Sequence, residues 1–137
     1  MDWKLELVLV PVSDVDRARD FYVERLGFRL DVDHRAGDSF RVVQMTPPGS
    51  ACSISIGTGI TSKPPGSVEG IHLIVTDIEA ARDVLVRRGV GPSGIFHFGS
   101  GGREPGPDPE RRDYGSFFGF SDPDGNSWVV QEVRSRA

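Results

Sequence analysis

The sequence predicts an α+β fold made of two tandem βαβββ modules, and two observations predict it. The first is an internal repeat, since Val-Ser-Asp-Val-Asp-Arg-Ala-Arg-Asp at 12–20 is echoed by Val-Thr-Asp-Ile-Glu-Ala-Ala-Arg-Asp at 75–83. The second is that each segment follows an apolar, β-like run and leads to a glycine, Gly27 or Gly89. A repeat of this length is a structural unit, so we expect a pseudo-symmetric pair that shares one site.

The first half has the pattern of a strand, a helix and three strands. Residues 5–12 are β-branched and aliphatic, which indicates a strand. Ser13 and Asp14 are N-cap residue types, and apolar residues at helical spacing follow them as far as Gly27. Three further strands are expected between glycine-containing turns, at 28–34, 40–46 and 51–56.

The second half repeats this order after a linker rich in Gly, Ser, Thr and Pro. We expect one domain over 1–137, with module one at about 3–57, the linker at 58–67 and module two at 68–134. In module two a helix begins after Asp77 and ends at Gly89, and the expected strands are 70–76, 95–98, 117–121 and 127–133. A Gly/Pro/charged loop at 99–113 has no counterpart in module one, so it is a candidate lid, with a plain surface excursion as the alternative.

Composition excludes several classes of partner. The formal net charge of −4 and the scattered arginines argue against nucleic acid. No apolar run approaches the roughly 18 residues of a membrane span, and the N-terminus lacks the layout of a secretory signal. The single cysteine, Cys52, cannot form an internal disulfide. We therefore expect a cytoplasmic protein with no nucleic-acid or membrane partner.

Two motifs carry a resemblance to a known superfamily. One is Pro11-Val12-Ser13-Asp14-Val15-Asp16-Arg17-Ala18, with Phe21-Tyr22 and Leu26-Gly27-Phe28 after it. The other is Phe120-Ser121-Asp122-Pro123-Asp124-Gly125-Asn126. Across essentially its whole length the chain resembles the vicinal oxygen chelate (VOC) superfamily, which includes glyoxalase I, the bleomycin-resistance proteins and the extradiol dioxygenases. The resemblance implies modules whose curved mixed sheets surround a shared cavity.

The resemblance also implies four metal-ligand positions, on the first and last strands of the modules. In this sequence they are occupied by Leu7, Ser53, Gly70 and Val129. Leu, Gly and Val side chains cannot bind a metal, and Ser is a poor ligand for zinc, nickel or iron. We therefore expect no cofactor at the usual site. The alternative is a relocated divalent metal, bound by His72 with His97 or with an acid of the loop.

Alternation along the strands predicts which side chains face the cavity. His72 is two residues past Gly70 and Gln131 is two past Val129, so both are expected on the inner face, with Ser55 as their first-module counterpart. An imidazole and an amide can both donate and accept, which suits a substrate-reading pair. A histidine satisfied by a carbonyl or water is the alternative. An imidazole can also act as a general base, which makes His72 a candidate catalytic residue.

Four further side chains are candidates for ligand binding, either because alternation along a strand places them on the inner face or because they lie beside the long loop. They are Gln44, His97, Tyr114 and Phe118. An aromatic stripe at strand spacing is more often part of a core than a ligand platform. Trp128 should point away from Val129 and Gln131, toward a helix.

Three functions remain open at the level of sequence. The first is a metal-independent, VOC-fold protein that binds a small organic molecule, for which the bleomycin-resistance branch offers a precedent and a homodimer is the usual assembly. The second is an enzyme of lyase, isomerase or dioxygenase type that uses a displaced metal or His72. A vestigial or protein-interacting module is a third possibility, in which inner-face substitutions would be silent.

Overall fold

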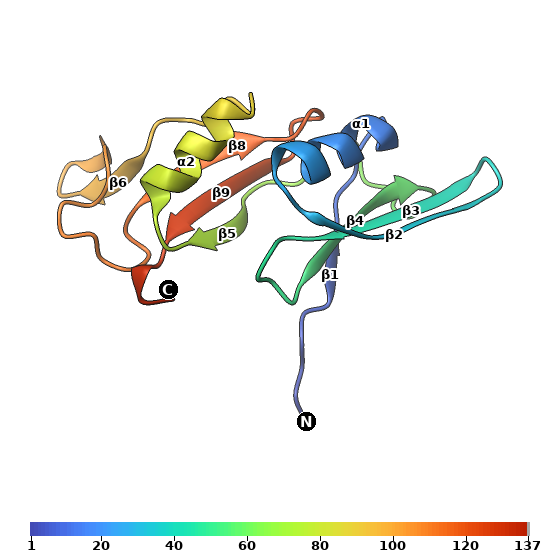
Figure 1. Ribbon diagram of the computed structural model, residues 1–137, viewed down its shortest axis with the longest axis horizontal. Helices are drawn as coiled ribbons and strands as arrows, with labels where there is room; N and C mark the ends of the chain where they lie inside the picture. Colours follow the sequence, from blue (N-terminus) through green and yellow to red (C-terminus); the bar gives the residue numbers. More distant parts are fainter. Residues whose placement is uncertain (137) are drawn as a thin grey trace. The chain divides into compact units, whose positions relative to one another are not determined.

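A computed structural model describes residues 1–136, and it divides the chain into two compact units. Unit 1 consists of Met1–Val68 and Asp122–Asn126, and unit 2 of residues 69–121 and 127 onward. Each unit contains a mixed sheet and a helix, which confirms the predicted α+β class (Figure 1). The cavity expected between the modules stays a prediction. Among the described residues, no helix has both the length and the apolar character needed to cross a membrane.

Unit 1 follows the expected order of elements. These are β1 (Leu7–Leu9), α1 (Val15–Asp20), the π-helical turn η1 (Phe21–Arg25), β2 (Arg29–Ala36), β3 (Phe40–Thr46) and β4 (Ser53–Thr58). The sheet order is β1-β4-β3-β2, with β1 and β4 parallel and the other pairs antiparallel. The strand expected at 5–12 is shorter because β4 pairs with only Leu7, Val8 and Leu9.

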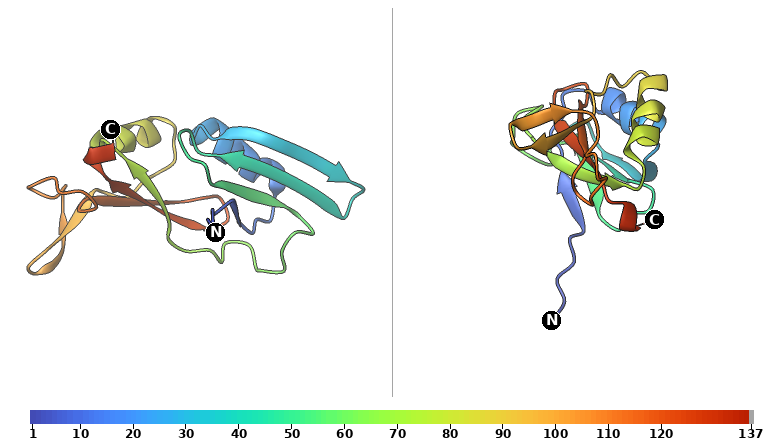
Figure 2. Two further views of the ribbon diagram at one scale, coloured as in Figure 1. Left: turned by 90° about the horizontal axis from the view of Figure 1, so that it is seen from below. Right: turned by 90° about the vertical axis from the view of Figure 1, so that its left-hand side faces the viewer.

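The helix α1 covers one face of this sheet. Asp14 begins it as predicted, because its side chain accepts a hydrogen bond from Arg17 N at 3.0 Å. Ala18, Phe21 and Tyr22 are buried, and the buried strand residues Val43, Met45, Ile54 and Ile56 form the rest of this core. The opposite face of the sheet carries no helix (Figure 2). We call it the open face of unit 1.

Unit 2 has one strand more than predicted. Its elements are β5 (Ile71–Val75), α2 (Ile78–Arg87), β6 (Phe96–Gly99), β7 (Gly102–Pro105), β8 (Phe117–Ser121), β9 (Ser127–Glu132) and the 3₁₀ turn η2 (Arg134–Arg136). The sheet order is β5-β9-β8-β6-β7. The expectation of a loop throughout 99–113 is wrong, because β6 and β7 form an antiparallel hairpin that continues to Pro105.

The helix α2 covers one face of the second sheet. Asp77 begins it, accepting a hydrogen bond from Ala80 N at 3.1 Å. The side chains of Ile78, Phe118, Phe120, Trp128 and Val130 are buried in this core, and Trp128 stacks on Phe120 with ring centroids 5.9 Å apart. Trp128 therefore lies on the side that the sequence predicted. We call the face opposite α2 the open face of unit 2.

The turn at Asp122–Asn126 belongs to unit 1, although the strands on either side of it belong to unit 2. Asp122 Oδ2 accepts a hydrogen bond from the buried Tyr22 hydroxyl at 2.7 Å. Asn126 Nδ2 donates to the Pro11 carbonyl at 2.8 Å, and its Oδ1 accepts from Val68 N at 3.1 Å. These buried polar groups satisfy one another, and so the turn motif has a structural role.

Candidate functional site

The open face of unit 2 brings together the two polar residues that the sequence singled out. His72 is paired with Val129, and Ile74 with Gln131, across the parallel strands β5 and β9. Phe117 of β8 lies opposite Gln131 on the other side of β9. Paired residues point to the same face, so His72, Gln131 and Phe117 share it. His72 and Gln131 are diagonal neighbours here, since each is paired with a different residue.

His72 is exposed, and its ring is oriented by its own strand. Its Nδ1 lies 2.7 Å from the carbonyl oxygen of Gly70. A carbonyl only accepts, so Nδ1 carries the proton and Nε2 of the neutral ring keeps a lone pair. This is the backbone-satisfied histidine that the sequence left open as an alternative, and it still presents one acceptor to solvent.

Gln131 and Tyr114 lie next to one another. Gln131 Nε2 donates to the carbonyl oxygen of Tyr114 at 3.1 Å. The Tyr114 hydroxyl accepts a hydrogen bond from Arg136 Nη2 at 3.0 Å, and about half of its side chain is exposed. The backbone of Tyr114 has a φ of 66°, an uncommon conformation for a residue other than glycine. Its N–H donates to the carbonyl of Glu132 at 2.8 Å, which holds the residue beside β9.

Three phenylalanines gather on the same open face, and the sequence singled out none of them as a ligand-binding candidate. The rings of Phe96 and Phe117 are stacked at 5.5 Å, and Phe98 meets both in edge contacts at 5.9 and 5.6 Å. The guanidinium of Arg103 lies 3.5 Å from the centre of the Phe96 ring. Phe98 is 61% exposed, so this cluster presents an aromatic surface to solvent. Only the alternation on either side of His97 could have indicated it.

Phe118 is not on this surface, contrary to the sequence-based expectation. It is fully buried in the core beside α2, because it alternates with Phe117 and therefore points to the other face. His97 also points away from Phe96 and Phe98. It is nearly buried, with Nδ1 2.8 Å from the Gly106 carbonyl and Nε2 3.2 Å from a Glu104 carboxylate oxygen. Since His72 and His97 lie on opposite faces, they do not fit one shared metal ion.

The open face of unit 1 carries Gln44 and Ser55, the two candidates from the first module. They are paired across β3 and β4, and Leu9 is the partner of Ser55 in β1. Ser55 is 2% exposed, and its hydroxyl is the one buried side-chain polar atom without a hydrogen-bond partner among the described residues. A buried hydroxyl gains free energy from any group that hydrogen-bonds it. Among the described residues, Ser55 is therefore the buried side chain whose hydrogen-bonding capacity is left unused.

The four positions implied for a metal do not fit one. Leu7 and Ser53 are paired across β1 and β4, and the Ser53 hydroxyl already hydrogen-bonds with Thr46 Oγ1 at 2.7 Å. Val129 is paired with His72, and Gly70 donates its backbone N–H to Ser127 O at 2.9 Å. One hydroxyl and three side chains without donor atoms make no site for a divalent metal. Elsewhere in the described residues, no cluster of three His, Cys, Asp or Glu side chains has the geometry for a metal.

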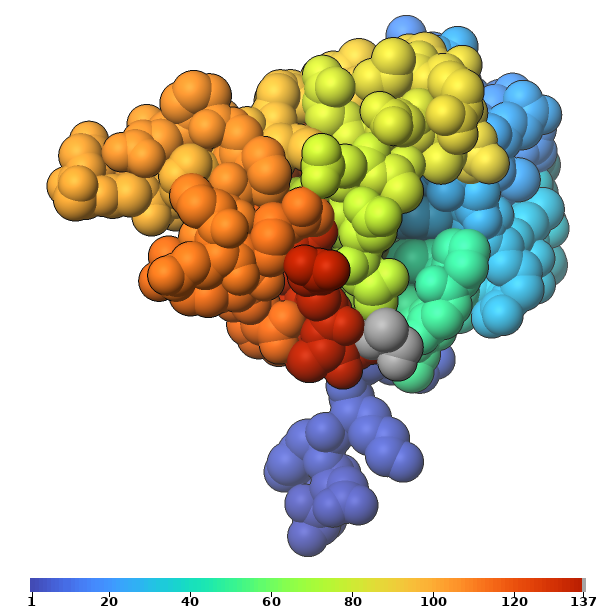
Figure 3. Space-filling model, turned by 60° about the vertical axis from the view of Figure 1, so that its left-hand side comes forward, coloured from blue at the N-terminus to red at the C-terminus, as the bar shows by residue number. Residues whose placement is uncertain are grey.

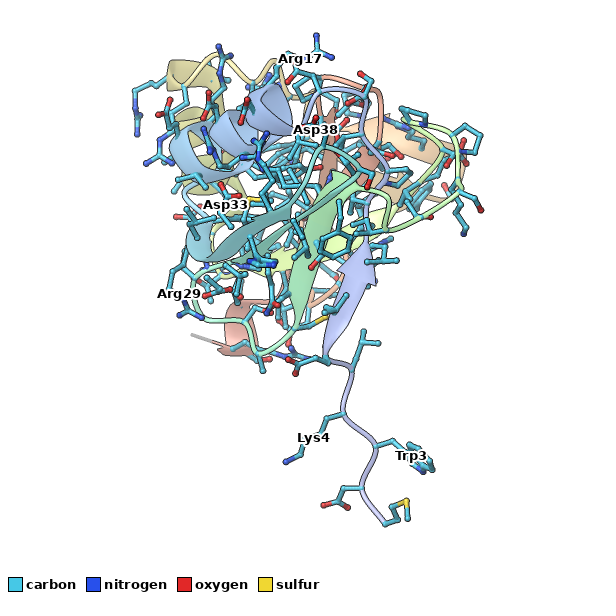
Figure 4. The ribbon with its side chains drawn as sticks, turned by 90° about the vertical axis from the view of Figure 1, so that its right-hand side faces the viewer. Trp3, Lys4, Arg17, Arg29, Asp33 and Asp38 are labelled. Carbon is cyan, nitrogen blue, oxygen red and sulfur yellow. The ribbon has the colours of Figure 1, made fainter. Side chains whose placement is uncertain are left out.

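Two hollows are lined by charged side chains, one in each unit, and Phe98 of the aromatic cluster also lines the second. The first, of about 320 Å³, lies between the start of α1 and the β2–β3 hairpin. Arg41 crosses it, contacting Asp16 at 2.8 Å and Asp33 at 2.9 Å, and the arginine lowers the pKa of both carboxyl groups. Figure 4 shows Asp33 and Asp38 on this hairpin. Since the charges are already paired, this hollow supports the fold rather than a ligand.

The second hollow, of about 310 Å³, lies beside His97 and Asp108. Asp108 is buried and accepts hydrogen bonds from Arg112 Nε at 2.8 Å and from Arg112 Nη2 at 3.1 Å. The Arg112 guanidinium holds the pKa of Asp108 well below its usual range. The charged groups of this hollow are also engaged with one another, so the open faces remain the better candidates.

The chain matches a known family model and is similar to several solved structures over nearly its full length. The family model of the Glyoxalase/Bleomycin resistance protein/Dioxygenase superfamily matches residues 4–130. The chain is 32% identical to TnmS3, an antibiotic binding protein from Streptomyces sp. CB03234, with a TM-score of 0.75 over 96% of this chain and 97% of that chain.

Two further solved structures are similar over almost their full lengths. A glyoxalase/bleomycin resistance protein, also from Streptomyces sp. CB03234, is 33% identical, with a TM-score of 0.72 over 94% of this chain and 100% of that chain. A member of the Glyoxalase/bleomycin resistance protein/dioxygenase superfamily from Sphaerobacter thermophilus DSM 20745 is 30% identical. Its TM-score is 0.74 over 96% of this chain and 98% of that chain.

Proposed function

Because the chain belongs to the Glyoxalase/Bleomycin resistance protein/Dioxygenase superfamily, we propose that it binds a small organic molecule, such as an antibiotic, without the usual metal. The similarity to an antibiotic binding protein supports this choice of ligand class. One observation carries the proposal: on the open face of unit 1, the buried hydroxyl of Ser55, between Leu9 and Gln44, has no hydrogen-bond partner among the described residues. Such a group is costly unless something else hydrogen-bonds it.

The chemistry of each open face, taken by itself, suits a neutral, partly aromatic ligand. Phe98 and its neighbours offer a flat apolar surface, and Arg103 adds a cation held over an aromatic ring. His72 Nε2 can accept a hydrogen bond from the ligand, and Ser55 can donate or accept one. Small-molecule sites usually combine a few polar groups with apolar surface.

Binding can be tested with a panel of antibiotics that includes bleomycin, first by thermal shift and then by calorimetry. For a compound that binds, we expect Ser55→Ala and His72→Ala each to lose about 1 to 3 kcal/mol of binding free energy, which raises Kd roughly 5- to 150-fold. Ser50→Ala, a serine in the exposed turn before β4, is the matched control and should bind as the wild type does. Unchanged binding in both open-face variants would refute the proposed site.

Proton transfer by His72 is a second candidate function. It is favoured by the Gly70 carbonyl, which holds the proton on Nδ1 and leaves Nε2 as a base. Turnover that disappears in His72→Ala while ligand affinity stays within a fewfold would establish it.

Whether the protein binds a metal is tested separately. The purified protein is soaked in zinc, nickel, manganese and ferrous iron, and its metal content is then measured by elemental analysis. We expect no stoichiometric metal in the wild type. Stoichiometric metal that His72→Ala abolishes would show a displaced metal site instead.

A further inference from the structure

A row of four side chains crosses the open face of unit 1, with polar residues at its centre and apolar residues at its ends. Ser55 of β4 is paired with Leu9 of β1 on one side and with Gln44 of β3 on the other. Gln44 is paired in turn with Val32 of β2. Leu9 is 41% exposed and Val32 is 42% exposed. The segment before β1 extends away from the sheet and does not fold back over it (Figures 1 and 3).

Beside this row, a chain of hydrogen bonds leads from Gln44 to a carboxylate. Gln44 Nε2 lies 3.4 Å from Ser53 Oγ, which lies 2.7 Å from Thr46 Oγ1. Thr46 Oγ1 in turn hydrogen-bonds with Asp31 Oδ2. Ser53 and Thr46 are both buried, so each of their hydroxyls is held by these neighbours and not by bulk water.

The number of protons in this chain determines its direction. The Thr46 hydroxyl and the Arg29 guanidinium lower the pKa of Asp31, so its carboxylate is ionised and only accepts hydrogen bonds. Thr46 has one hydroxyl proton and donates it to Asp31, so Ser53 must donate its own proton to Thr46. The Ser53 oxygen then has only lone pairs to offer, and it accepts from an N–H of Gln44. Asp31 therefore determines, through two hydroxyls, which end of the Gln44 amide faces Ser53.

This orientation leaves the amide oxygen of Gln44 without a partner. Oε1 accepts no hydrogen bond from the described residues and is not among their buried unpartnered atoms, so it is open to solvent. The hydroxyl of Ser55, which is paired with Gln44, also has no partner in the described part of the chain. The Cβ atoms of paired residues lie about 4.5–5.5 Å apart, so one small group can reach both side chains.

We propose that this row binds a neutral hydroxyl group of the ligand, which donates a hydrogen bond to Gln44 Oε1 and accepts one from the Ser55 hydroxyl. Asp31 is a positioning residue, because it keeps Oε1 free for the ligand without touching the ligand itself. A carboxylate or an ether has no proton to donate to Oε1, and a site that hydrogen-bonds a hydroxyl discriminates against an analogue that lacks it. The inference rests on the proposed function and narrows its ligand class.

The ligand class is tested with three one-ring probes, phenol, anisole and benzoate, by NMR of ¹⁵N-labelled protein. Binding is followed at the side-chain amide of Gln44 and the backbone amide of Ser55, with the side-chain amide of Gln131 in unit 2 as a reference. We expect phenol to bind at least about tenfold more tightly than anisole, and benzoate not to shift these signals. Gln44→Met keeps an unbranched side chain without the amide, so the preference for phenol should fall to about threefold or less.

The role of Asp31 is tested by interrupting the chain at Thr46→Val. This variant frees the Ser53 proton for donation to Gln44 Oε1, so the preference for phenol over anisole should again fall to about threefold or less. Thr58→Val is the matched control. Thr58 is an exposed residue of the same sheet, and its partner in β3, Arg41, points toward α1. It should keep the wild-type preference, and far-UV circular dichroism should be unchanged in both variants.

The ratio of the two affinities separates positioning from folding, because a variant that only loosens the fold weakens phenol and anisole alike. Equal binding of phenol and anisole by the wild type would overturn the proposal, and so would Gln44 and Ser55 signals that no probe shifts. A Thr46→Val variant that keeps the full preference would refute the role of Asp31. Antibiotic binding without a preference for phenol would refute this inference alone, whereas a preference for phenol without antibiotic binding would refute the antibiotic as ligand class.

Discussion

Glu132 is a fully buried carboxylate, and both of its oxygens accept hydrogen bonds. Arg111 donates to it through Nη2 at 2.6 Å and Nε at 2.9 Å, and the backbone N–H of Ile78 donates at 2.9 Å. The Arg111 guanidinium therefore lowers the pKa of Glu132 despite its burial. Because Arg111 also contacts Glu79 at 2.9 Å, this cluster ties the loop after β7 to both β9 and α2.

Glu132 should make the free energy of unfolding depend on pH. A carboxyl whose pKa is lowered on folding contributes stability above its unfolded pKa of 4.5 and loses it as the pH falls through the lower folded value. We expect Glu132→Gln to cost about 3 kcal/mol at pH 7, and the gap from the wild type to shrink below pH 4.5. Urea unfolding between pH 7 and pH 3 measures it, with the exposed Glu69→Gln as control. A gap that stays constant with pH would contradict the assignment.

At the scale of single residues, alternation predicted which side chains share a face but not which face a helix covers. Alternation correctly placed Phe117 and Phe118 on opposite faces of β8. Phe118 is the buried one because α2 covers its face, and the alternation of residues along a strand does not predict where a helix packs. The sequence also could not predict that the Ser55 hydroxyl lacks a hydrogen-bond partner, because its neighbours belong to the separate strands β1 and β3. The sequence could nominate Ser55 by parity, but only the packed sheet shows that its hydroxyl lacks a partner.

At the scale of elements, local signals predicted the helices well. Asp14 and Asp77 both begin helices because a short carboxylate can satisfy a free N–H of the first turn. The hairpin of β6 and β7 was missed because its sequence, with Gly99, Gly101 and Gly102, is typical of a loop. Its pairing with the sheet depends on a single contact, between Phe96 and Phe117, that is distant in sequence.

The pair β3–β4 contains a close approach that only glycine permits. A Cβ added to Gly57 would lie 1.9 Å from the carbonyl oxygen of Arg41, which is backbone and cannot move aside cheaply. Arg41 also anchors Asp16 and Asp33. A shift of this strand would therefore disturb the ion pairs that join α1 to the sheet.

We expect Gly57→Ala to destabilise the protein by about 2 to 4 kcal/mol, as overpacking against a fixed backbone does. Gly94→Ala is the matched control, because a Cβ there meets nothing within 4 Å and the backbone is not in a left-handed conformation. It should change the unfolding free energy by less than about 0.5 kcal/mol. Equal midpoints for the two variants in chemical denaturation would mean that β3 yields more easily than its contacts indicate.

At the scale of the whole molecule, the repeat predicted two modules but not the exchange of a turn between them. The segment Asp122–Asn126 packs in unit 1, whereas β8 and β9 on its two sides belong to unit 2. No local signal predicts this, because the same Asp-Pro-Asp-Gly sequence would form a turn in either unit. The chain thus crosses between the units at 68–69 and again on both sides of the turn, so neither unit is made from one continuous segment.

Because of this exchange, Asn126 is the last residue of the unit 1 turn before the chain returns to unit 2. Its amide joins the Pro11 carbonyl, Val68 N and Asp122 in a buried network. Asn126→Ala leaves these groups unsatisfied, so we expect a loss of about 2 to 4 kcal/mol. In chemical denaturation, the unfolding midpoint measured by far-UV circular dichroism and the midpoint measured by the fluorescence of Trp128, which is buried in unit 2, should fall by the same amount. Ser121→Ala, an exposed neighbour, is the control. If Trp128 kept its wild-type midpoint, the units would unfold independently and the turn would stabilise unit 1 alone.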